Sequence, residues 1–124
     1  MSTSTSFGTI LWQDLTVENA EEVSRFYTEV IGWKASPHDM GEYHDYDMQG
    51  DDGKTIAGIC HAKGPNANLP AQWLIYINVK DVEKSAAKCR EHGGEVLDGP
   101  RMMGGSKFCA IRDPGGAVLA LVSD

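Results

Sequence analysis

The sequence predicts an α+β fold built from two βαβββ modules. The chain of 124 residues resembles itself at an offset of 62 residues. Each half reads as a strand, a helix and three further strands. Each half also has a tight turn before its last strand, at residues 50–53 and 113–116. Two copies are too few for a solenoid, so we expect a domain of paired modules.

The two halves match without a gap at the offset of 62 residues. Their turn residues and apolar positions coincide, although few residues are identical. The matched segments are 17–19 with 79–81, Gly32 with Gly94, 51–53 with 113–115, and 56–59 with 118–121. Because helix ends and turns fall at equivalent positions, we expect the same order of elements in both halves.

The first half begins with an apolar strand over residues 9–17, followed by a helix. Asn19 is the expected N-cap, with Glu22 completing a capping box, and Gly32 ends the helix. The expected apolar face of this helix comprises Ala20, Val23, Phe26, Tyr27, Val30 and Ile31. The strands expected after it cover residues 33–35, 43–48 and 55–60.

The second half repeats this order, with a strand over residues 73–79 and a helix capped by Asp81. Gly93 and Gly94 end the helix. Its expected buried stripe comprises Val82, Ser85, Ala86 and Cys89. The strands expected after it cover residues 95–97, 108–111 and 117–122.

These patterns divide the chain into four parts. We expect a flexible polar tail over residues 1–8 and a first module over 9–61. A segment rich in Gly, Pro and Asn over residues 62–72 is the expected linker, and the second module covers 73–124.

Composition and charge exclude several classes of protein. Hydrophobic residues make up 41% and charged residues 23%, which is typical of a soluble globular chain. Eleven basic and 18 acidic residues give a net charge of −7 without a basic cluster, so we expect no nucleic-acid or membrane partner. Cys60, Cys89 and Cys109 lie too far apart in sequence for a disulfide framework, which favours a cytoplasmic location.

Local motifs in both halves resemble one known family. Phe26 and Tyr27 followed by Val-Ile-Gly-Trp at 30–33, Val-Lys-Asp-Val at 79–82 before Gly-Gly-Glu-Val at 93–96, and Asp-Pro-Gly-Gly at 113–116 carry the resemblance. In this order they resemble the glyoxalase/bleomycin-resistance/dioxygenase superfamily, also called vicinal oxygen chelate. The resemblance implies a curved mixed sheet that lines a cup, with the helices packed outside. A ferredoxin-like sandwich is the alternative, but it would not need the closing turn in both halves.

The resemblance also implies where a metal would bind. Enzymes of the family hold one divalent ion in the cup through His, Glu or Gln on the first and last strand of each module. Those positions fall on Trp12, Gly58, Leu74 and Ala120, whose side chains offer no lone pair to a hard cation. We therefore expect neither a metal nor another cofactor in the cup, with recruitment of a metal by His38, His44 or His61 left open.

The cup of this chain is expected to be apolar and aromatic with a few polar groups. Strand alternation places Leu11, Leu15 and Val17 toward the helix. The expected ligand-binding residues are Trp12, Asp14, Tyr46, Leu74, Tyr76, Asn78, Phe108 and Ala120. Such a lining suits an apolar or planar ligand, and aromatic rings beside a carboxylate also suit an organic cation.

Three functions are compatible with these features. The first is a metal-free protein that binds a small molecule, as in the antibiotic-resistance branch of the family. The second is a metal-dependent lyase, isomerase or dioxygenase with relocated ligands. The third is an association module, which predicts a filled cup and an exposed apolar patch elsewhere. The resemblance also implies a homodimer, and no catalytic residue is identified.

Overall fold

A computed structural model describes residues 6–124 of the chain as two compact units. The first module is Gln13–Trp73, and the second module joins residues 6–12 to Leu74–Asp124. Of the expected tail, residues 1–5 lie outside the described part. Gly8 is held in the second module because its N–H donates to the carbonyl oxygen of Asn78 at 2.7 Å.

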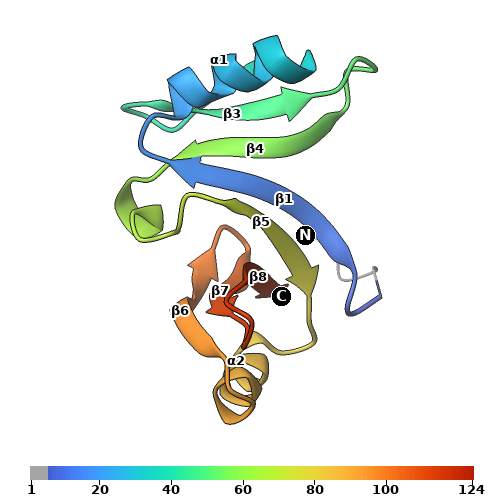
Figure 1. Cartoon of the computed structure of the whole chain (residues 1–124), viewed down its shortest axis with the longest axis vertical. Coiled ribbons are helices and arrows are strands. Elements are labelled where there is room, and N and C mark those ends of the chain that lie inside the picture. The colour runs from blue at the N-terminus through green and yellow to red at the C-terminus, as the bar shows by residue number, and fades with distance from the viewer. Residues whose placement is uncertain (1–5) are drawn as a thin grey trace. The chain divides into compact units, whose positions relative to one another are not determined.

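The described residues follow the predicted βαβββ order twice, which confirms the α+β class (Figure 1). The strands follow the hydrogen-bonded order β2-β3-β4-β1-β5-β8-β7-β6 in a mixed sheet. A short 3-10 helix, Gly64–Asn66, lies in the expected linker. The elements are β1 (Ile10–Val17), α1 (Ala20–Ile31), β2 (Lys34–Asp39), β3 (His44–Gln49), β4 (Thr55–His61), β5 (Trp73–Asn78), α2 (Val82–Glu91), β6 (Glu95–Met103), β7 (Ser106–Arg112) and β8 (Val118–Ser123). No helix among residues 6–124 combines the length and the apolar character needed to cross a bilayer.

The parallel strand pairs confirm the internal repeat. In the first module β1 and β4 pair Asp14 with Gly58. In the second module β5 and β8 pair Tyr76 with Ala120, and both partners are displaced by 62 residues. The same backbone register has therefore formed twice.

The antiparallel pairs depart from the repeat by one residue. Tyr46 of β3 lies opposite Ile59, whereas the partner of Leu121 in β7 is Cys109. Residues 46 and 109 are 63 apart in sequence, so the second half has gained one residue before β7. Because side chains alternate along a strand, this difference decides which face each β3 residue occupies.

The core of the first module lies between α1 and one face of its strands (Figure 1). Its buried members are Leu15, Ala20, Met48, Ala57 and Ile59. Three aromatic rings, those of Tyr27, Trp33 and Trp73, pack beside it, and the indole N–H of Trp73 donates to the Tyr27 hydroxyl at 3.1 Å. Leu15 and Val17 face the helix as expected.

Half of the apolar face expected on α1 is not buried. Phe26, Val30 and Ile31 are 56%, 64% and 52% exposed. Ser24 is buried instead, because its hydroxyl donates to the carbonyl oxygen of Glu21 at 2.8 Å and needs no water. The helix therefore contacts the sheet along a stripe rotated away from Phe26 and Val30.

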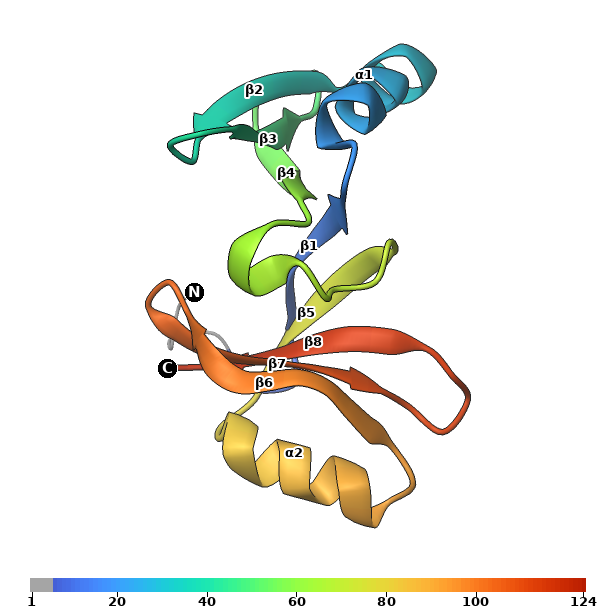
Figure 2. The same cartoon turned by 90° about the vertical axis from the view of Figure 1, so that its left-hand side faces the viewer.

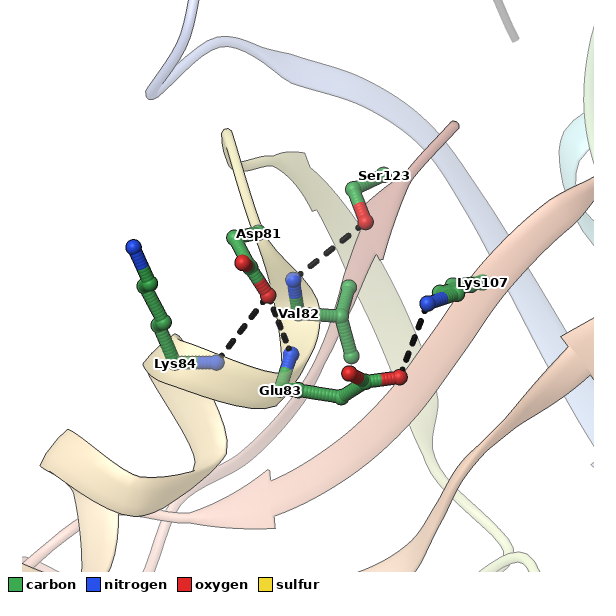
Figure 3. Close-up of polar contacts among 6 residues, drawn as sticks. All are labelled: Asp81, Val82, Glu83, Lys84, Lys107 and Ser123. Atoms are coloured by element: carbon green, nitrogen blue, oxygen red, sulfur yellow. Dashed lines mark hydrogen bonds and ion pairs between the residues drawn. The ribbon is translucent and has the colours of Figure 1, made fainter.

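The two helices begin differently. Asp81 caps α2 as expected, since its carboxylate accepts from the N–H groups of Glu83 and Lys84, and the Ser123 hydroxyl accepts from Val82 N–H (Figure 3). The capping box expected at α1 is wrong. Asn19 accepts no backbone hydrogen bond through its side chain, and its amide donates to the Glu22 carboxylate at 3.3 Å.

The second module has its own core against α2, which lies along one face of β6, β7 and β8 (Figure 2). Val82, Ala86, Cys109 and Leu121 form its buried part, and Ile77 and Val79 pack against them. The strand expected at residues 95–97 continues to Met103 as β6, with register shifts that are characteristic of β-bulges.

Candidate functional site

Each module has a sheet face that its helix does not cover, which we call the helix-free face. In the first module it carries Asp14, Asp47, Gly58 and Cys60, which alternate with side chains of the α1 core. In the second module it carries the predicted site residues Leu74, Tyr76, Asn78, Phe108 and Ala120.

The helix-free face of the first module is acidic. Asp14 and Asp47 both lie opposite Gly58, one on each neighbouring strand, so no side chain separates the two carboxylates across β4. Asp45 lies one pair further along β3, where its carboxylate accepts from the His61 N–H at 2.8 Å. His38 on β2 faces Asp47 with 3.9 Å between its Nδ1 and Oδ2 of Asp47.

Cys60 reports the field of these carboxylates. Burial raises the pKa of its thiol far above the ordinary value, and the negative charges of Asp14 and Asp45 raise the pKa further. The thiol is therefore protonated at neutral pH, which is the unreactive form. The arrangement attracts positive charge and offers no nucleophile.

The helix-free face of the second module is aromatic and closed. Leu74, Phe108 and Ala120 have no exposed surface, and Tyr76 is 2% exposed. The rings of Tyr76 and Phe108 lie 6.0 Å apart between centroids. The Asn78 side chain donates to the carbonyl oxygen of Ser6 at 3.3 Å. A ligand would reach these residues only after a covering side chain moves.

Two predicted site residues occupy less expected positions. Tyr46 packs against the α1 core rather than on the helix-free face, because the one-residue difference between the halves turns it to the opposite side. Trp12 is half-buried on β1, two residues before Asp14 and on the same side of the strand. The structure thus groups Trp12 with Asp14 and leaves Tyr46 apart.

The metal positions implied by the resemblance do not fit a divalent ion. Trp12, Gly58, Leu74 and Ala120 carry no donor atom of the kind that such an ion requires. The parallel register supports their equivalence, since Asp14 pairs with Gly58 as Tyr76 pairs with Ala120.

The histidines do not form an alternative metal centre in the part of the chain that the structure describes. No group of three or more His, Cys, Asp or Glu side chains among residues 6–124 is arranged to hold an ion. His61 Nδ1 lies 2.8 Å from the main-chain oxygen of His44 rather than beside its ring. His61 also lines a hollow of about 340 Å³ on the α1 side of the module, with Asn19, Glu21, Glu22 and Arg25.

Sequence reasoning missed four charged residues on the helix-free faces. Asp45 and Asp47 follow strand alternation and become visible once β3 is counted from Met48. Asp98 and Arg101 on β6 form an ion pair above Phe108. No spacing rule finds that pair, because a bulge separates its members.

Comparisons with known proteins agree with this architecture. The sequence model of the Glyoxalase/Bleomycin resistance protein/Dioxygenase superfamily matches residues 9–121. The Mycobacterium bovis protein CFP32, which carries a provisional glyoxylase name, is 25% identical over 116 residues. That match covers 93% of this chain but 44% of CFP32, so the chain spans less than half the length of this relative.

Solved structures show the same fold at low sequence identity. A Streptomyces coelicolor methylmalonyl-CoA epimerase variant in complex with 2-nitronate-propionyl-CoA has a TM-score of 0.56 and 20% identity, covering 96% of this chain and 99% of the epimerase. A superfamily member from Vibrio splendidus 12B01 has a TM-score of 0.59 and 12% identity, covering 94% and 100%. Since the family model spans nearly the whole chain, the protein belongs to the glyoxalase/bleomycin resistance protein/dioxygenase superfamily.

Proposed function

We propose that this protein is a metal-free member of its superfamily that binds a small organic molecule carrying positive charge on a planar or apolar body. The observation that carries the proposal is the loss of donor atoms at Trp12, Gly58, Leu74 and Ala120. A divalent ion at these positions would meet an indole, a hydrogen, an isobutyl group and a methyl group. Binding in the absence of metal is then what the fold can still perform.

The first module supports a cationic ligand. Asp14 and Asp47 present carboxylates across the side-chain gap at Gly58, and Trp12 precedes Asp14 on the same face of β1. A ring beside a carboxylate attracts an organic cation through both the quadrupole of the ring and the charge. The net charge of −7 acts in the same direction.

The ligand chemistry of the epimerase does not transfer readily. The Streptomyces coelicolor epimerase structure holds an analogue of a coenzyme A ester, and such a molecule carries several negative charges. The acidic first module of this chain would repel it. The proposed ligand therefore differs from that of the epimerase in the sign of its charge.

Binding is tested with protein purified without added metal. Native mass spectrometry reports bound metal and any molecule that co-purifies. Calorimetric titration in EDTA then measures the affinity for N-methylquinolinium, a planar cation, and for neutral quinoline. Asp14→Asn and Asp47→Asn should each weaken binding of the cation about two- to fivefold, the range of a partly exposed charge pair. Asp51→Asn, an exposed carboxylate in the β3–β4 turn, is the matched control and should change nothing.

Two results would overturn the proposal. One is stoichiometric metal in the purified protein that the cation requires for binding. The other is equal affinity for the two probes in every variant, since a carboxylate face must discriminate between them.

A second observation supports self-association. Phe26, Val30 and Ile31 form an exposed apolar stripe on α1, and the helix-free face of the second module is filled. We propose that a second copy of this chain covers the stripe, because CFP32 continues well beyond the matched segment and this chain lacks that extra length. A stable interface needs about 800 Å² per partner, of which these side chains would form the apolar centre.

Sedimentation velocity tests this association. The dimer should dissociate when Val30→Glu places a charge in the stripe, whereas Arg25→Ala on the same helix should leave it intact. A monomer at all concentrations up to 100 times that used in the binding assay would contradict it.

A further inference from the structure

A bulge in β6 brings two opposite charges onto one face of the second module. Asp98 lies opposite Ala110, and Arg101 lies opposite Phe108, so three residues of β6 span two of β7. Without the extra residue, side chains 98 and 101 would point to opposite faces. Gly99 permits the bulge, because its φ is +85° and a Cβ there would lie 2.5 Å from the Phe108 carbonyl oxygen.

The pair is held in a fixed geometry. Arg101 donates through Nε and Nη2 to the two carboxylate oxygens of Asp98, both at 2.9 Å. The side chains of Arg101 and Asp98 are 22% and 14% exposed. A bidentate pair shielded in this way orients the guanidinium plane more firmly than a surface ion pair does.

The guanidinium covers the aromatic floor. Its carbon lies 4.8 Å from the centroid of the Phe108 ring, and Phe108 has no exposed surface. Tyr76 contacts Phe108 on the same face. The helix-free face of the second module therefore already holds one planar cation, between a ring and a carboxylate.

We propose that Arg101 is a movable cover and that the ligand of this face is a planar organic cation, which takes the place of the guanidinium between Phe108 and Asp98. This inference rests on the proposed function and names the residues that would set its ligand class. Arg101 is a specificity-determining residue in this scheme, and Asp98 is the recognising carboxylate.

The direction of exchange follows from the lengths of the two side chains. A cationic ligand leaves Asp98 paired, and the long Arg101 side chain can turn its head group into water. An anionic ligand would have to take Arg101 from Asp98 and leave a shielded carboxylate without its partner, which is costly. The site therefore selects for positive charge.

The test uses isotope-labelled protein and the same two probes, N-methylquinolinium and quinoline. In the unmodified chain the cation should shift the ring resonances of Phe108 and Tyr76. Arg101→Ala removes the cover and should tighten binding of the cation at least tenfold. Arg112→Ala is the matched control, since Arg112 is an arginine on β7 that is paired with Glu95 at 3.1 Å, and it should leave the affinity unchanged.

Further variants keep the inference testable if Arg101→Ala is unstable. Arg101→Lys retains the charge without the planar fork, so its affinity should fall between those of the unmodified chain and Arg101→Ala. Asp98→Asn combined with Arg101→Ala should remove the preference for the cation over quinoline.

The outcomes separate this inference from the proposed function. Equal effects of Arg101→Ala and Arg112→Ala, or binding that leaves the Phe108 resonances unmoved, would overturn the cover. Binding that shifts only resonances near Asp14 would overturn it as well and leave the proposed function standing. Absence of binding by every variant would refute both.

Discussion

Substituting Gly99 by alanine should destabilise the protein through a clash with its own neighbouring strand. Gly99 has a φ of +85°, which costs an alanine about 1 to 2 kcal/mol. The new Cβ would also lie 2.5 Å from the Phe108 carbonyl oxygen and 3.2 Å from Cα of Cys109. Both neighbours are backbone, so the strand itself must shift, which costs about 1 to 3 kcal/mol more.

Gly104 in the same hairpin isolates the two contributions. Its φ is +61°, and a Cβ there would meet no atom within 4 Å. Gly104→Ala should therefore cost only the conformational part, about 1 to 2 kcal/mol. The free energy of unfolding from urea titrations measures both variants. In thermal melts Gly99→Ala should lower Tm by about 10 °C or more, at roughly 3 to 5 °C per kcal/mol for a domain of this size. A difference below about 0.5 kcal/mol between the variants would refute the close approach at Gly99.

Three further changes test other parts of the structure. Asp81→Ala removes two backbone hydrogen bonds at the start of α2 and should cost about 1 kcal/mol in urea titrations, whereas Asn19→Ala should cost less than half of that because Asn19 caps no N–H group. Phe108→Ala should cost about 3 to 5 kcal/mol, the usual range for a buried ring, and a loss under 1 kcal/mol would show that the floor is not packed. Burial raises the pKa of the Cys109 thiol from 9.0 to about 11, so the folded state favours the neutral thiol and loses this stability as the pH rises from 9 to 11. Urea midpoints across that range should fall less in Cys109→Ser, and an unchanged slope would contradict the assignment.

Strand alternation and the internal repeat predicted most of the fold from sequence. The helix-facing positions of β1 follow directly from the pattern, as Leu15 shows. The repeat then carried the assignment to β5 and β8, where Tyr76 and Ala120 pair as Asp14 and Gly58 do. This transfer works because parallel pairing between equivalent strands leaves no freedom of register once one face is buried.

The errors arose where one residue was inserted or where a side chain had two possible partners. Tyr46 was placed on the wrong face because the offset between the halves changes from 62 to 63 at β3. Phe26 and Val30 belong to the apolar pattern of α1 but lie beside its contact stripe, since the hydroxyl of Ser24 satisfies itself locally and can be buried. The Asp98–Arg101 pair depends on a bulge, which hydrophobic periodicity does not reveal.

The duplicated register explains why the loss of metal ligands leaves two different surfaces rather than one. Gly58 and Ala120 occupy equivalent positions opposite Asp14 and Tyr76, so the backbone treats the two halves alike. Their neighbours, however, carry carboxylates in the first module and hydrocarbon in the second. A metal ion needs donors from equivalent positions, whereas an organic cation needs charge from one surface and a ring from another. Divergence of the two halves therefore opposes the first kind of ligand and favours the second, and Arg101 stacked on Phe108 is an example of the second within the chain itself.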